Sequence, residues 1–225
     1  MSAGWRVVGV SVTGPGHVRD GVGNQDAFEH HRTPDGFVLA VAHGCRSALD
    51  AWLAVAAARD AARAVLAGPP AARPAWPGLA RDYAAAVLGT VDPAATALLA
   101  LVARPPRYLY LSTGDCFLVV EHRRGGAHLI APPDGTTNPG HAGVIDDARI
   151  TGVAAATGGL RDGMLGADRA ADGSHRLLAP ADFTGYLRAF ATPGAGPADL
   201  RRRFESDAFA ATSADDKTIV LAARP

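Results

Sequence analysis

The sequence contains little cysteine and has no excess of charge of either sign. Two cysteines in 225 residues, Cys45 and Cys116, cannot build a disulfide framework. The 22 basic and 22 acidic residues cancel, so no basic surface for nucleic acid or an anionic membrane is expected. The uncharged runs are too short to span a bilayer, and residues 1–6 lack the apolar core of a signal peptide. We therefore expect a cytoplasmic protein without nucleic-acid or membrane partners.

Lysine is almost absent, since Lys217 is the only one among the basic residues, whereas alanine is frequent. This bias is typical of a GC-rich bacterial genome. Hydrophobic residues make up 48% of the chain and charged residues 20%, which is a globular composition. The length favours one large domain covering residues 1–225.

Hydrophobic periodicity predicts an α+β protein. Strand-like apolar runs lie at residues 5–13, 37–42, 96–103, 108–112, 117–121, 128–130, 150–156 and 218–223. Helical patterns cover residues 47–66, 79–91, 180–191 and 197–204, and the segments 17–26, 68–78, 131–147 and 161–178 are predicted to be loops or linkers. Because strands and helices come in runs and do not alternate, the order favours antiparallel sheets in layers with helices.

The helix predicted over residues 47–66 is the clearest of these elements. Ser47 is a candidate N-cap, and the large apolar residues of the helix share one face with Ala56. These large residues are Leu49, Trp52 and Leu53.

Acidic residues lie at several turns beside predicted strands: Asp26, Asp115 and the pair Asp215-Asp216. Carboxylates that converge at one end of a sheet sandwich are suitable ligands for Mg²⁺ or similar hard cations. Aspartate is also an ordinary turn former, so these positions taken singly have a second explanation.

Taken together, six segments resemble the bacterial branch of the metal-dependent Ser/Thr phosphatases, the protein phosphatase 2C family. They are residues 16–27, 39–48, 95–100, 109–118, 154–160 and 215–222, and they follow the family order along nearly the whole chain. The resemblance implies a four-layer α-β-β-α sandwich of mainly antiparallel sheets flanked by helix pairs. It also implies a site at one end of the sandwich.

The same resemblance assigns candidate site residues. The metal ligands of the family correspond here to Asp26, the carbonyl of Gly44, Asp115 and Asp216. His17 and Arg19 stand where the family places groups near the incoming phosphate.

Three positions depart from the family pattern. His43 replaces the carboxylate that bridges two cations, Gly158 replaces a second central carboxylate, and Arg46 replaces a turn glycine. Arg46 is therefore expected to lie beside the site. His43 with Cys45 offers too few ligands for a zinc site.

The loss of the bridging carboxylate is serious on electrostatic grounds. Two divalent cations about 3.5–4 Å apart repel each other by about 17 kcal/mol at an effective dielectric of about 20. Carboxylates must offset that repulsion, and His43 supplies no negative charge. We expect weak binding of at most one Mg²⁺ or Mn²⁺; imidazole prefers Zn²⁺, but a zinc site is less expected.

Three functions follow from this pattern. The first is a pseudophosphatase that binds a phosphoprotein or a regulatory partner, such as a kinase or its substrate. The second is an active phosphoserine/phosphothreonine phosphatase with a rearranged metal centre. The third is a different enzyme that uses His43 as a general base or nucleophile.

Overall fold

The structure is a computed structural model that describes residues 4–68, 75–133, 140–169 and 175–225. Its strands are β1 (Arg6–Val12), β2 (Asp26–Arg32), β3 (Phe37–Gly44), β4 (Thr96–Arg104), β5 (Arg107–Thr113), β6 (Phe117–His122), β7 (Gly126–Ala131), β8 (His141–Asp146), β9 (Ile150–Ala156), β10 (Gly166–Arg169), β11 (His175–Leu178) and β12 (Lys217–Ala223). Its helices are α1 (Pro15–Asp20), α2 (Ala48–Ala67), α3 (Trp76–Leu88), a 3₁₀ turn (Gly158–Leu160), α4 (Arg161–Met164), α5 (Ala181–Ala191), α6 (Pro197–Phe204) and α7 (Asp207–Ala210). None of these described helices is long and apolar enough to cross a membrane.

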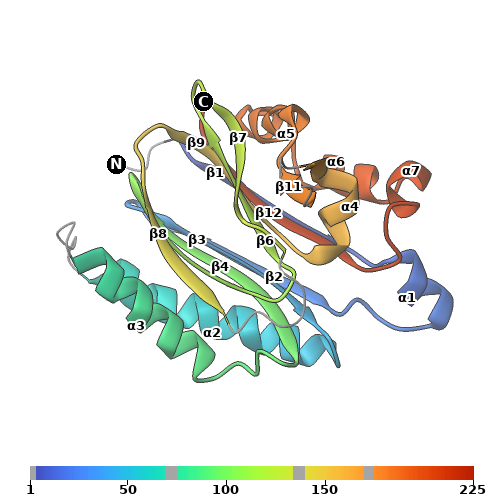
Figure 1. Cartoon of the computed structure of the whole chain (residues 1–225), viewed down its shortest axis with the longest axis horizontal. Coiled ribbons are helices and arrows are strands. Elements are labelled where there is room, and N and C mark those ends of the chain that lie inside the picture. The colour runs from blue at the N-terminus through green and yellow to red at the C-terminus, as the bar shows by residue number, and fades with distance from the viewer. Residues whose placement is uncertain (1–3, 69–74, 134–139, 170–174) are drawn as a thin grey trace.

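Two five-stranded antiparallel sheets form the centre of the molecule. One has the order β1-β12-β9-β6-β7 and the other β2-β3-β4-β5-β8, while β10 and β11 form a small hairpin. Helices α2 and α3 cover the second sheet, and α5 and α6 cover the first, as Figure 1 shows. The predicted four-layer α-β-β-α sandwich is therefore confirmed.

Successive side chains of a central strand point to opposite faces of its sheet, and both faces are covered by apolar layers. In β3, Leu39 and Val41 face the core between the sheets, whereas Val38 and Ala40 face the layer under α2. A strand that is covered on both faces must be apolar at every position, so the run at 37–42 shows no polar alternation.

The large apolar residues of helix α2 would be expected to face the core, but the helix is turned so that they face solvent. Its small residues, such as Ala51 and Ala58, are buried against the sheet, while Leu49, Trp52 and Leu53 are 64%, 51% and 58% exposed. Small side chains allow the helix axis to approach the sheet closely, so the alanine face packs inward. The N-cap prediction is confirmed, because the Ser47 side chain accepts a hydrogen bond from the Asp50 amide.

Several predicted loops contain regular structure. The segment 17–26 holds most of α1, 131–147 contains β8, and 161–178 contains α4, β10 and β11. Strand β2 was also missed, because it is an edge strand whose last residues are exposed and polar. Helix α3 begins at Trp76, inside the predicted 68–78 linker. Residues 69–74, 134–139 and 170–174 of these segments lie outside the described residues.

Candidate functional site

Strand ends from both sheets meet at one end of the sandwich, which we call the carboxylate pole and define by Asp26, His43, Asp115 and Asp216. Asp26 begins β2 and lies opposite His43 of β3 in the antiparallel register. Asp115 precedes β6, and Asp216 directly precedes β12. Residues far apart in the sequence are thus gathered because the strands that carry them end at the same edge.

The Asp26 carboxylate is fully engaged by protein donors. Its Oδ1 lies 2.9 Å from His43 Nδ1, and its Oδ2 accepts a hydrogen bond of 2.8 Å from the Thr157 hydroxyl. The Asp26 side chain is completely buried, whereas that of His43 is 23% exposed. Because the carboxylate sits beside its ring, the pKa of His43 is raised above its usual value.

The Asp216 carboxylate is bound in a similar way. Its Oδ1 accepts a hydrogen bond from the Gly14 amide at 2.7 Å, and its Oδ2 accepts one from the Gln25 amide at 2.5 Å. His17 Nδ1 lies 2.9 Å from the same Oδ2. The pole therefore contains two imidazole–carboxylate pairs, His43–Asp26 and His17–Asp216.

Asp115 occupies the space beside Gly158. A Cβ atom added to Gly158 would lie 1.9 Å from Asp115 Oδ2, so this carboxylate fills the position where a side chain at 158 would begin. Burial raises the pKa of the Asp115 carboxyl group above its usual range. Gly44 is confined as well, because its added Cβ would lie 2.0 Å from the carbonyl oxygen of Ser47.

Two predicted site residues are directed to other partners. The Arg46 guanidinium pairs with Asp92 at 2.8 Å and is 66% exposed, so it is directed to a surface partner, and its place beside the site stays a prediction. Arg19 forms an ion pair with its neighbour Asp20 and is 73% exposed, and no hydrogen bond joins it to the His17–Asp216 pair. Within the described residues, the structure thus brings His17 but not Arg19 into contact with Asp216.

Thr157 and Lys217 are parts of the pole that the sequence analysis did not assign. Lys217 is buried, and its Nζ donates to the carbonyl oxygens of Ser213 and Asp215 at 2.8 and 3.1 Å. Burial lowers the pKa of this ammonium group. The sequence offered one signal for them: Thr157 directly precedes Gly158, and Lys217 directly follows Asp216, inside two of the segments that resemble the family.

The residues present do not fit a two-metal centre. Two cations need several carboxylates to offset their charge, and His43 and Gly158 supply none, while each carboxylate oxygen of Asp26 and Asp216 already has a protein partner. Among the residues that the structure describes, no group of three or more His, Cys, Asp or Glu side chains is arranged to hold a metal ion. The assignment of Asp26, Gly44, Asp115 and Asp216 as metal ligands stays a prediction.

The four-layer sandwich with carboxylates at one end agrees with the family that the sequence motifs resemble. Residues 13–143, more than half of the chain, match the sequence profile described as Protein phosphatase 2C. The chain belongs to this family, as its motifs indicated.

Solved structures support the same fold. The serine/threonine phosphatase Stp1 from Staphylococcus aureus superimposes with a TM-score of 0.63 at 11% identity, covering 98% of this chain and 95% of that one. PppA, a key regulatory component of T6SS in Pseudomonas aeruginosa, gives 0.59 at 17% identity with 98% of both chains covered. RsbX, solved in complex with magnesium, gives 0.58 at 13% identity with 100% and 98% covered. No curated protein sequence matches the chain.

Proposed function

We propose that this protein is a pseudophosphatase: a phosphatase 2C scaffold that binds a phosphoprotein or a regulatory partner and hydrolyses phosphate esters poorly or not at all. The observation that carries the proposal is the hydrogen bond between His43 and Asp26. An imidazole stands where the family has a bridging carboxylate, and it engages the very oxygen that a cation would need. Thr157 engages the other oxygen of Asp26.

The charge balance supports the same conclusion. His43 and Gly158 together remove two negative charges relative to the family pattern. The remaining carboxylates offset less of the repulsion between two divalent cations, about 17 kcal/mol at an effective dielectric of about 20, than the full family set would. Their buried oxygens are instead stabilised by amide, hydroxyl and imidazole donors, which is how buried carboxylates are normally satisfied.

The proposed partner follows from the family and from PppA, which is described as a regulatory component. A scaffold that lost hydrolysis while keeping its fold retains the surface around the pole for recognition. We therefore place this chain beside a phosphorylated protein, a kinase or a kinase substrate, in the cytoplasm and as one domain over residues 1–225.

Turnover of a phosphoserine peptide and of p-nitrophenyl phosphate tests the proposal, with Mg²⁺, Mn²⁺, Zn²⁺ or EDTA added in turn. We expect no metal-stimulated phosphate release above the background of Asp26→Asn and Asp216→Asn variants. Calorimetry should show at most one weak Mg²⁺ site. Metal-stimulated turnover that both variants abolish, or two tight Mg²⁺ sites, would establish the rearranged-centre phosphatase instead.

A second candidate function rests on the same hydrogen bond. A buried carboxylate that orients a partly exposed imidazole is the arrangement of a general base, since the carboxylate holds the ring and stabilises its protonated form. This His43-dependent enzyme would show EDTA-resistant turnover that His43→Asn removes. Equal EDTA-resistant turnover in the wild type and in His43→Asn would eliminate this candidate.

A further inference from the structure

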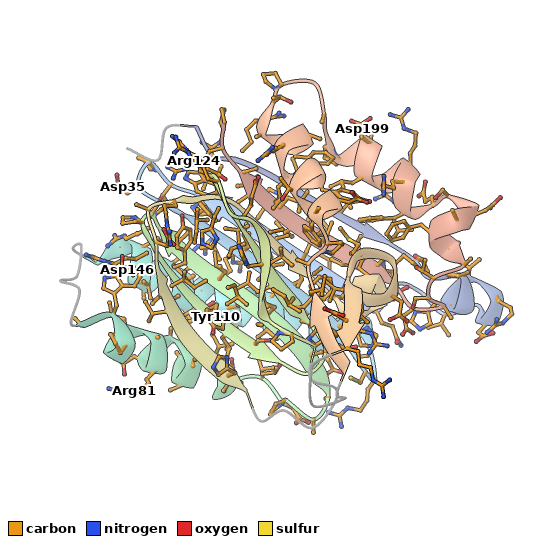
Figure 2. The ribbon with its side chains drawn as sticks, turned by 45° about the horizontal axis from the view of Figure 1, so that its top comes forward. Asp35, Arg81, Tyr110, Arg124, Asp146 and Asp199 are labelled. Carbon is orange, nitrogen blue, oxygen red and sulfur yellow. The ribbon has the colours of Figure 1, made fainter. Side chains whose placement is uncertain are left out.

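A basic pocket lies at the end of the sandwich opposite the carboxylate pole. It is a half-open hollow of about 640 Å³, within the usual range of ligand pockets, and we call it the distal basic pocket. Its lining residues are His122, Arg123, Arg124, Gly125, His128 and Arg149. Strand β6 begins two residues after Asp115 and ends at His122, so its six residues separate the two ends by about 20 Å. In Figure 1 the turn after β6 lies beside the C-terminus and far from α1, and Figure 2 labels Arg124 there.

The turn that presents the arginines is anchored by hydrogen bonds. The Arg123 amide donates to the Arg149 carbonyl at 2.9 Å, which fixes the turn to the start of β9. The Gly125 amide donates to the His122 carbonyl at 3.2 Å, and His128 Nε2 lies 2.9 Å from the Gly125 carbonyl oxygen. The backbone of the pocket wall is thus held in place before any ligand arrives, so a ligand has to order only the arginine side chains.

The charges in the distal basic pocket are not balanced. Asp147 is the carboxylate in contact with it; it pairs with Arg149 at 2.6 Å and lies 3.3 Å from His122 Nε2. The side chains of Arg123 and Arg124 have no hydrogen-bond or ion-pair partner within the described part of the chain. Three arginines against one aspartate leave two positive charges while both histidines are neutral.

Neighbouring carboxylates are committed to other arginines. Glu121 pairs with Arg188 at 3.0 Å, and Asp146 lies 3.7 Å from Arg107. Glu121 lines a neighbouring cavity together with Arg123, but its ion pair is with Arg188. The imbalance is local, since the whole chain has no net charge.

We propose that the distal basic pocket binds a phosphate monoester, either a phosphorylated side chain of a partner protein or a phosphorylated small molecule. A phosphate monoester carries a charge of about −1.5 to −2 at pH 7, which matches the two uncompensated positive charges. The planar guanidinium group binds phosphate oxygens through paired N–H donors. The inference stands on the distal basic pocket alone and does not depend on whether the pole hydrolyses anything.

Nuclear magnetic resonance titration of the full-length, ¹⁵N-labelled protein tests this site. The probes are a phosphoserine peptide, its unphosphorylated counterpart, adenosine monophosphate and inorganic phosphate. Amides of residues 122–128 and 149 should shift with the phosphorylated probes. The variant R123A/R124A should weaken that binding at least tenfold, whereas R81A/R202A, which removes two exposed arginines from α3 and α6, should leave it within twofold.

The probes separate the two sources of the ligand, and an assay separates this site from the pole. Tighter binding of the phosphopeptide than of inorganic phosphate and the nucleotide supports a phosphoprotein ligand, and the reverse order supports a small molecule. Equal weakening in both double variants, shifts centred on His17 and His43, or no binding of any probe would overturn the proposal. Phosphate release, measured in parallel, reports on the pole and should be unchanged in R123A/R124A.

Discussion

Thr157 is the residue at the carboxylate pole whose role is clearest from hydrogen bonding. Its hydroxyl donates to Asp26 Oδ2 at 2.8 Å, and its Oγ1 accepts from the Thr218 amide at 3.2 Å. It is 1% exposed, so water cannot replace either bond. Thr157 thus joins β2, β9 and β12 at the site.

Replacing Thr157 with valine should therefore destabilise the fold. The variant leaves a buried carboxylate oxygen and a buried amide without partners, at a cost of about 1–3 kcal/mol. Urea unfolding measures the change. Thr90→Val is the control, because Thr90 is exposed and bonds only a carbonyl at the end of α3, and it should change stability by less than about 0.5 kcal/mol. Equal stability of both variants would show that the Thr157 hydroxyl is not needed.

Restoring the family carboxylates should restore metal dependence. The double variant His43→Asp with Gly158→Asp returns two negative charges to the pole, so it should bind Mn²⁺ more tightly than the wild type and gain hydrolysis of p-nitrophenyl phosphate. Asp115 must rotate, because it fills the space at Gly158, but its carboxylate is the end of a flexible side chain. Each single variant should gain much less, since one carboxylate leaves the cations under-neutralised. Wild-type turnover equal to that of the double variant would favour the rearranged-centre enzyme.

At the scale of elements, the β1–α1 turn is fixed against the loop before β12. A Cβ added to Gly14 would lie 2.2 Å from the carbonyl carbon of Asp215, which is backbone and cannot move aside cheaply. Gly14→Ala should therefore cost at least about 1–3 kcal/mol of stability. Thermal unfolding measures it, with Gly23→Ala as the control, because a Cβ there meets nothing within 4 Å. A melting temperature unaltered by Gly14→Ala would mean that the turn and the loop are not packed as described.

Helix α2 provides a second contrast between element faces. Val55 is completely buried against the sheet, whereas Trp52 is 51% exposed. Val55→Ala should destabilise the protein by about 2 kcal/mol, because it removes buried methyl groups and leaves a cavity. Trp52→Ala should cost less than about 0.5 kcal/mol in the same urea measurement. A larger loss for Trp52→Ala than for Val55→Ala would reverse the assigned orientation of α2.

At the scale of the whole molecule, both sheets contribute to one shared core. Trp5, just before β1, and Phe37 of β3 lie there with ring centroids 4.9 Å apart. Val153 of β9 and Val220 of β12 pack in the same core. Strand β1 pairs with β12, so the two ends of the described chain close the same sheet. Neither sheet can retain its inner face in an apolar environment without the other.

We therefore predict that residues 1–225 unfold as one unit. Tryptophan fluorescence reports on Trp5 between the sheets, on Trp76 at the start of α3 and on the half-exposed Trp52 of α2. Far-ultraviolet circular dichroism reports on all strands and helices. The two signals should change together along a urea titration. Two separated transitions would divide the chain into more than one folding unit. The native spectrum should show mixed α and β content.

The order and type of most elements follow from the sequence, because apolar periodicity and turn residues are local properties. Buried strands such as Phe37–Gly44 and the long helix Ala48–Ala67 were therefore predicted correctly, within a few residues. The edge strand β2 and the hairpin β10–β11 were not, since exposed strands lack a continuous apolar run. The motifs also identified the family, because their order along the chain is preserved.

Only the tertiary structure determined which atoms meet at the carboxylate pole. The sequence placed His43 where a carboxylate was expected, but the hydrogen bond from its ring to Asp26 depends on the antiparallel register of β2 and β3. The partner of Arg46 and the exposed face of α2 depend on how the helix packs on the sheet, which hydrophobic periodicity does not specify. The distal basic pocket likewise forms from the β6–β7 turn and the residue before β9, which fold together at one end of a sheet. The sequence determines which residue types occupy each element, because secondary-structure preference is local. Contacts between residues far apart in the chain form only when the two sheets pack on their common core.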